Sequence, residues 1–218
     1  TNHPDIAIGD IIGSNIANII LVMGATTVLC PIVNITRNQI NQAAINIVIA
    51  LGLIMMSLFM VQFNPVFGVI ALILLAVIMA YQVKIGSLNF SDVEEQGEYS
   101  MFISGILIVI GILFLVYGSK FFVSGAVNIA TVYGIPESVI GVSLVAFGTS
   151  LPELAVGILS AIRKKVDFAL GNVLGSNIYN VLGVLGVTSF FGRFEFPPLI
   201  ASFDLYVMTG VIVFITIY

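Results

Sequence analysis

Long apolar stretches with very few charges run along almost the whole chain. Only 8% of the 218 residues are charged, 59% are hydrophobic, and the mean hydropathy is +1.17. A soluble domain carries about 25% charged residues, so this chain has too few polar side chains to cover a water-facing surface. The sequence therefore predicts an all-α, multi-pass integral membrane protein of the plasma or inner membrane. Seven stretches are expected to be spans: Ala7–Cys30, Asn41–Val61, Pro65–Gln82, Met101–Tyr133, Pro136–Ile162, Phe168–Phe191 and Pro198–Tyr218.

The positions of the basic residues indicate how these spans are oriented. Met101–Tyr133 would be about 50 Å long as one helix, so it is expected either to tilt or to form two elements. If it crosses once, then Arg37, Lys84 and the Arg163–Lys165 cluster lie on one side of the membrane, which the positive-inside rule makes cytoplasmic. We expect this single crossing, which leaves Lys120 inside the span as a snorkelling or locally paired lysine.

Few residues outside the expected spans could act in catalysis or in metal binding. Ser87–Ser100 is the only sizeable polar segment, and its acidic residues lack the spacing of an EF-hand, so we expect a solvated cytoplasmic loop. The single cysteine, Cys30, excludes an intrachain disulfide, and the single histidine, His3, is terminal. With no nucleophile–base pair or metal triad visible, the sequence predicts neither an enzyme nor a prosthetic group, and no nucleic-acid partner.

One segment of the chain occurs twice. DIAIGDIIGSNIANIILVMGAT (Asp5–Thr26) aligns without gaps to DFALGNVLGSNIYNVLGVLGVT (Asp167–Thr188) at an offset of 162, with eleven of 22 positions identical. Five spans separate the two starts, and because five is odd the copies are expected to cross in opposite directions. This is an inverted-topology repeat, typical of secondary transporters. Its expected parts are residues 1–83 in the first repeat, a loop over 84–100, and residues 101–218 in the second repeat.

A second motif, GTSLPE, occurs only once, at Gly148–Glu153. By the same offset, its counterpart in the first repeat would lie before Thr1. We therefore expect the chain to be a fragment of a ten-span protein, covering about spans three to nine, and to be monomeric when full length. An alternative is a natural short form that dimerises to complete the site.

The GTSLPE motif also indicates a break in the fifth span. Ser150 and Glu153 have the spacing of a capping box, and Pro152 suits a first helical turn, so the motif has a plain structural interpretation as a helix start. However, a helix start halfway along a span leaves backbone polar groups at membrane depth, which is tolerated only where they are buried in protein or line a cavity. An intramembrane glutamate is a functional candidate, so we favour a binding site around Glu153.

The repeated GSN segments place further polar side chains beside this break. Two serine–asparagine pairs share a helix face in the two copies: Ser14 with Asn18, and Ser176 with Asn180. Helix packing is the alternative role for such residues, but their symmetric recurrence favours a site. Asn15 and Asn177 point elsewhere and are expected to hold neighbouring backbone.

All of these groups would bind through oxygen. They are hydroxyls, amide oxygens, a carboxylate and a backbone carbonyl freed by the break, such as that of Ala146. Hard cations, Ca²⁺ or Na⁺, match such a set. If a first copy of GTSLPE supplied a second glutamate, two carboxylates would balance one Ca²⁺ or roughly two to three Na⁺, which suits exchange of one for the other.

GTSLPE together with the paired GSN segments resembles the alpha repeats of the sodium/calcium exchanger family, in the cation/calcium antiporter superfamily. The resemblance covers the whole chain. It implies ions bound at the midplane between broken helices, with alternating access driven by a long sliding helix, here the fourth span. Carried over to this sequence, the implied ligands of the transported Ca²⁺ and Na⁺ are Glu153, Thr149, Ser150, the Ala146 carbonyl, Ser14, Asn18, Ser176 and Asn180.

Two positions depart from the repeat or from the family pattern. Asn180 stands where potassium-dependent relatives carry aspartate, which argues against K⁺ co-transport. Asp10 stands where the second copy has Asn172, and we interpret it as a helix-start or outer vestibule residue rather than a ligand. Two other functions stay open: a Ca²⁺/H⁺ antiporter of the same superfamily, and a non-transporting membrane scaffold subunit.

Overall fold

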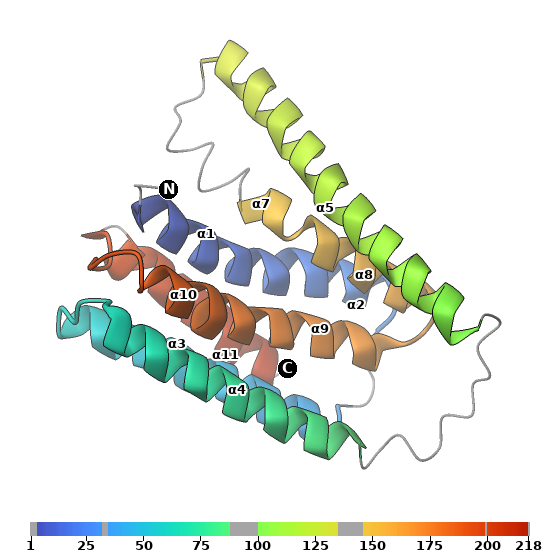
Figure 1. Cartoon of the computed structure of the whole chain (residues 1–218), viewed down its shortest axis with the longest axis horizontal. Helices are drawn as coiled ribbons and strands as arrows, with labels where there is room; N and C mark the ends of the chain where they lie inside the picture. Colours follow the sequence, from blue (N-terminus) through green and yellow to red (C-terminus); the bar gives the residue numbers. More distant parts are fainter. Residues whose placement is uncertain (1–3, 32–34, 88–99, 135–145, 199, 218) are drawn as a thin grey trace.

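A computed structural model describes residues 4–31, 35–87, 100–134, 146–198 and 200–217. Within these ranges the regular elements are helices, as predicted (Figure 1). Five helices of the described part are long and apolar enough to cross a bilayer: Ile8–Leu29, Arg37–Leu58, Pro65–Lys84, Met101–Val132 and Val166–Thr188. Leu151–Ile162 and Ile200–Thr216 are shorter apolar helices. The acidic loop at 88–99 and the first part of the expected fifth span, at 136–145, lie outside the described residues.

Two helical rods, one from each copy of the repeat, form the centre of the bundle. The first rod is α1 (Pro4–Ala17), η1 (Asn18–Met23) and α2 (Gly24–Leu29); the second is α9 (Val166–Ile178), η4 (Tyr179–Leu185) and α10 (Gly186–Thr188). The rods contact each other and run in opposite directions (Figure 1). In both, a π-helical segment follows the GSN triplet at the equivalent position. Such segments occur often at functional sites, and the sequence analysis did not predict them.

Three further helices cover the rods on one side: α3 (Arg37–Leu58), α4 (Pro65–Ser87), and α11 (Leu205–Ile217) with its π-helical lead-in η5 (Ile200–Asp204). The helix α3 packs against α9 and α11, while α4 packs against η4 and α10. The start of α3 precedes the expected Asn41, because Thr36 and Gln39 form a full capping box.

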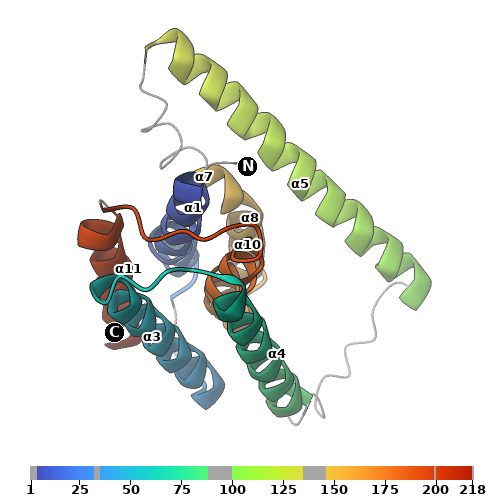
Figure 2. The same ribbon diagram turned by 60° about the vertical axis from the view of Figure 1, so that its left-hand side comes forward.

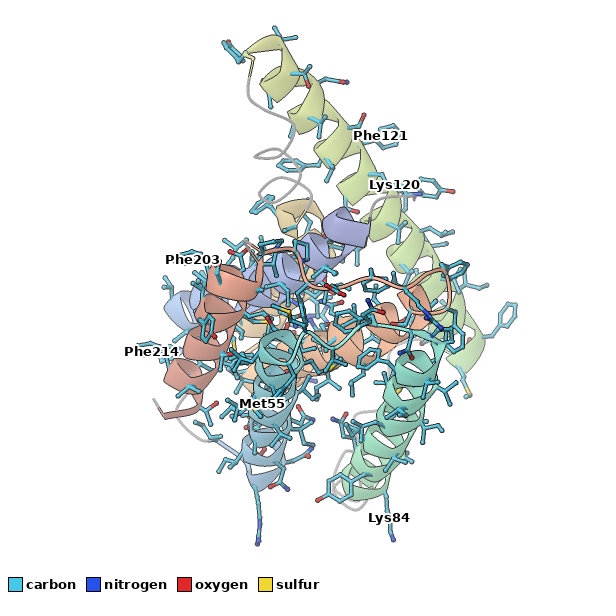
Figure 3. All side chains as sticks on the ribbon, turned by 90° about the vertical axis from the view of Figure 1, so that its left-hand side faces the viewer. Met55, Lys84, Lys120, Phe121, Phe203 and Phe214 are labelled. Carbon is cyan, nitrogen blue, oxygen red and sulfur yellow. The ribbon has the colours of Figure 1, made fainter. Side chains whose placement is uncertain are left out.

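The fourth span is one continuous helix, α5 (Met101–Val132), about 48 Å long. It lies apart from the bundle, and its main contacts in the described part of the chain are with α7 (Ala146–Thr149) and α8 (Leu151–Ile162) at the bundle's edge (Figure 2). Lys120 is exposed on α5 and its Nζ lies 6.0 Å from the centre of the Tyr117 ring (Figure 3). This local partner agrees with the expected locally paired lysine.

Gly68 marks the closest approach of α4 to α10. A Cβ added at Gly68 would lie 2.6 Å from the Gly186 carbonyl oxygen and 2.7 Å from Phe190 Cε2. A backbone oxygen cannot move aside, so we expect Gly68→Ala to lower the free energy of unfolding by about 1–3 kcal/mol. Gly52→Ala is the matched control, since its Cβ would meet nothing within 4 Å and alanine favours the helix by up to about 1 kcal/mol. Thermal unfolding of both variants in detergent measures the difference, and equal stabilities would contradict the prediction.

Candidate functional site

The predicted break in the fifth span lies at Ser150, between α7 and α8. Ser150 occupies the capping position of α8 but forms no side-chain cap hydrogen bond, so the capping-box interpretation is wrong. Its buried hydroxyl instead donates to the Ser14 carbonyl oxygen at 3.4 Å and ties the break to α1. The Ala146 carbonyl was expected to be free. It is not, because it accepts from the Ser150 N–H at 3.3 Å and lies 3.0 Å from Thr149 Oγ1.

Beside the break, oxygens from α1 and α7 form a tight cluster. Ser14 Oγ and Thr149 Oγ1 are 2.8 Å apart and share a hydrogen bond. Asp10 Oδ1 lies 3.1 Å from Thr149 Oγ1 and 3.3 Å from Ser14 Oγ, and the Asp10 carbonyl oxygen lies 2.6 Å from Ser14 Oγ. We call the oxygens of Asp10, Ser14, Ala146 and Thr149 the hydroxyl cluster. Asp10 lies within α1 rather than at its start, so it is not a helix-start residue, and its side chain contacts two of the predicted ligands, Ser14 and Thr149.

Three other predicted ligands line one open pocket of about 330 Å³ between α8 and the second rod. They are Glu153, Ser176 and Asn180, and the Ser176 side chain hydrogen-bonds with Glu153. Gly171 and Gly175 form part of the wall and leave room beside the carboxylate. The pocket thus brings a carboxylate, a hydroxyl and an amide together at the helix break.

Four asparagines join the two rods through a symmetric network of hydrogen bonds. Asn18 Nδ2 donates to Asn177 Oδ1 and Asn180 Nδ2 donates to Asn15 Oδ1, both at 3.0 Å. Asn15 Nδ2 donates to the Asn177 carbonyl at 3.4 Å, and Asn177 Nδ2 to the Asn15 carbonyl at 3.3 Å. The prediction that Asn15 and Asn177 hold neighbouring backbone is confirmed. The amide nitrogens of Asn18 and Asn180 are engaged in this network, whereas Asn18 Oδ1 receives no hydrogen bond and is available to a ligand.

Two oxygens of the site are buried without a hydrogen bond. Among the described residues, four buried side-chain oxygens receive no hydrogen bond: Asn18 Oδ1 and Glu153 Oε2 among the predicted ligands, and Asn38 Oδ1 and Gln42 Oε1 elsewhere. A buried carboxylate oxygen without a hydrogen bond is costly unless a cation or proton compensates it. No group of three or more His, Cys, Asp or Glu gathers in the described part of the chain, so the available ligands are mostly neutral oxygens. Such a set suits Ca²⁺ or Na⁺ and offers nothing to softer metals.

The predicted residues therefore fall into two groups. Glu153, Ser176 and Asn180 share the pocket, while Ser14, Thr149 and Ala146 share the hydroxyl cluster. The two remaining residues, Asn18 and Ser150, are buried between helices. Sequence reasoning missed Asp10, although its spacing of four from Ser14 places both on one helix face and was a usable signal.

The chain is similar to known transporters. The family profile described as sodium/calcium exchanger protein matches residues 1–84 and 103–218. An uncharacterised membrane protein of Methanocaldococcus jannaschii is 38% identical over 192 residues, 86% of this chain and 61% of that protein. The sodium/calcium exchanger MaX1 of Methanosarcina acetivorans is 42% identical over 103 residues, 47% of this chain and 28% of that one. A solved structure of the sodium-calcium exchanger NCX_Mj, soaked with Na⁺ and Sr²⁺, matches with a TM-score of 0.81 at 33% identity, over 99% of this chain and 69% of that chain.

Proposed function

The chain belongs to the sodium/calcium exchanger family, and we propose that the complete protein is a secondary antiporter that exchanges Ca²⁺ for Na⁺ by alternating access. The observation that carries the proposal is the buried, uncompensated Glu153 carboxylate in a pocket with Ser176 and Asn180. The chain spans 61% of the length of its M. jannaschii relative, so the activity is proposed for the complete protein.

The proposed architecture is an inverted-topology repeat with its site near the midplane. Residues 1–83 belong to the first repeat, 84–100 to a cytoplasmic loop, and 101–218 to the second repeat. The antiparallel rods and their equivalent π-helical segments support this division. The detached position of α5 supports a role as the sliding helix that opens and closes the site.

Eight residues are the proposed ligands. Three line the Glu153 pocket, three belong to the hydroxyl cluster, and the last two, Asn18 and Ser150, are buried between helices. Glu153 supplies the charge, Ser176 and Asn180 add neutral oxygens beside it, and the hydroxyl cluster adds a second set of oxygens. Neutralisation of the carboxylate by a cation lowers the cost of closing the site against water. An empty site resists closure, so ions are exchanged rather than leaked.

The names of two relatives support sodium coupling. MaX1 is named a sodium/calcium exchanger, and NCX_Mj is a sodium-calcium exchanger soaked with Na⁺ and with Sr²⁺, a Ca²⁺ analogue. Proton coupling is the competing possibility, because glutamate protonation also neutralises the site.

Radioactive Ca²⁺ uptake into vesicles that contain the complete protein tests the proposal. We expect an outward Na⁺ gradient to drive uptake and a pH gradient of equal size, without Na⁺, to drive none. Uptake that follows the pH gradient and ignores Na⁺ would assign the Ca²⁺/H⁺ function instead. No uptake under either gradient would contradict antiport.

A further inference from the structure

Asp10 brings a second carboxylate to the group of predicted ligands. Its Oδ1 lies 3.1 Å from Thr149 Oγ1 on α7 and 3.3 Å from Ser14 Oγ on its own helix. Its carbonyl oxygen adds a third contact, 2.6 Å from Ser14 Oγ. Asp10 is only half-buried, whereas Ser14 is buried, so the carboxylate lies where the cluster opens outward.

The two copies of the repeat differ at the position of this carboxylate. At the equivalent position of the second rod stands Asn172, which lines the Glu153 pocket. The same backbone position therefore faces predicted ligands in both halves, with a negative charge in one and a neutral amide in the other. An amide of nearly the same shape is compatible with the helix there, so helix geometry does not require the charge of Asp10.

The oxygens of the hydroxyl cluster could hold a small cation if they moved slightly farther apart. Oxygens that hold Ca²⁺ at 2.3–2.6 Å stand about 3.3–3.7 Å apart at right angles, and Na⁺ is of nearly the same size. The contacts among Asp10, Ser14 and Thr149 span 2.6–3.3 Å because hydrogen bonds draw these oxygens together. A cation that replaces these hydrogen bonds must spread the oxygens by only about half an ångström.

The charge of the cluster selects between the two candidate ions. Its single carboxylate balances one Na⁺ by itself, whereas Ca²⁺ would need a second carboxylate beside Asp10 to balance both of its charges. We propose that Asp10 is a further ligand of the transport site, which strengthens Na⁺ binding by the oxygens of Ser14, Thr149 and Ala146. This inference rests on the proposed function, to which it adds a residue that sets the preference for Na⁺.

The test compares Asp10→Asn with the wild-type complete protein. Asparagine keeps the Oδ1 acceptor and removes only the charge. We expect the Na⁺ concentration for half-maximal exchange to rise about tenfold, which is the loss of one charged contact. The maximal rate per folded protein is expected to change far less. Asp167→Asn is the matched control, because Asp167 Oδ1 accepts from Gln39 Nε2 at 3.1 Å away from the predicted ligands, and its half-saturating Na⁺ should stay at the wild-type value.

A second readout does not depend on transport. Bound Na⁺ raises the melting temperature of the folded protein, and titration with NaCl against choline chloride gives the midpoint of this stabilisation. The midpoint is expected to shift about tenfold in Asp10→Asn and to stay unchanged in Asp167→Asn. An Asp10→Asn protein with the wild-type midpoint in both assays would overturn the inference while leaving the antiporter proposal intact. A wild-type protein that is stabilised by Na⁺ but moves no Ca²⁺ would overturn the antiporter proposal alone.

Discussion

Replacement of Glu153 by glutamine is expected to lower Na⁺-driven Ca²⁺ uptake by at least about a hundredfold. The substitution keeps the shape of the side chain and its contact with Ser176, but it removes the only carboxylate among the residues that line the pocket. Loss of one buried charge that faces a divalent ion costs about 3 kcal/mol or more, which corresponds to that factor. A neutral side chain also removes the penalty that keeps an empty site from closing.

The measurement is Ca²⁺ uptake into Na⁺-loaded vesicles, together with Ca²⁺ binding to purified protein. Glu195→Gln is the matched control, since Glu195 is exposed and its Oε1 accepts from Gln62 Nε2 at 2.7 Å, a bond that glutamine can keep. Only the Glu153 variant should lose uptake and binding. Unchanged Ca²⁺ binding in Glu153→Gln would exclude Glu153 as a ligand and favour a non-transporting scaffold.

The fold was predictable from the sequence where hydropathy alone decides it. Within the described residues the apolar stretches correspond to helices, and α5 is unbroken because no proline in Met101–Val132 interrupts it. Details that depend on contacts between distant segments were not predictable. The π-helical segments η1 and η4 have no signature in their apolar composition, and α4 continues five residues beyond Gln82 because no proline or cap stops it before Ser87.

The site was predictable to the level of residue type and helix face. The recurrence of Ser14 and Asn18 at an offset of 162 indicated paired polar faces, and the single motif around Glu153 indicated the break. The roles of Asp10 and Ser150 depended on partners far along the chain. Thr149 is 139 residues from Asp10, and Ser14 is 136 residues from Ser150. Local spacing alone therefore suggested a helix-start role for Asp10 and a cap for Ser150.

The asparagine network explains why the GSN triplets recur with so little change. One interhelical hydrogen bond in a membrane protein contributes about 0.6 kcal/mol, which is too little to fix two rods. The four bonds are linked, since Asn15 and Asn177 each donate to the other's backbone and accept from the asparagine proposed as a ligand on the opposite rod. The network therefore both joins the rods and orients the amides of Asn18 and Asn180.

Replacement of Asn177 by alanine is expected to lower the free energy of unfolding by about 2–4 kcal/mol and to weaken Ca²⁺ binding. Asn18 Nδ2 would lose its acceptor, and Asn177 is fully buried, so the substitution also leaves a small cavity. Without the hydrogen bond to Asn177, the Asn18 amide would no longer be held in the orientation that presents its oxygen to a cation. Asn128→Ala on the exposed part of α5 controls for removal of an amide, and it should cost less than about 0.5 kcal/mol.

Double-mutant cycles separate the network from simple packing. The Asn18–Asn177 and Asn180–Asn15 bonds have the same length, 3.0 Å, and equivalent positions in the repeat, so their coupling energies are expected to be equal and to lie between about 0.6 and 1.7 kcal/mol. Chemical unfolding in detergent measures both. Because Asn18 is fully buried and Asn180 is partly exposed in the pocket, a coupling present only at Asn18 would mean that burial matters rather than the repeated geometry. Zero coupling in both cycles would reduce the four asparagines to independent packing residues.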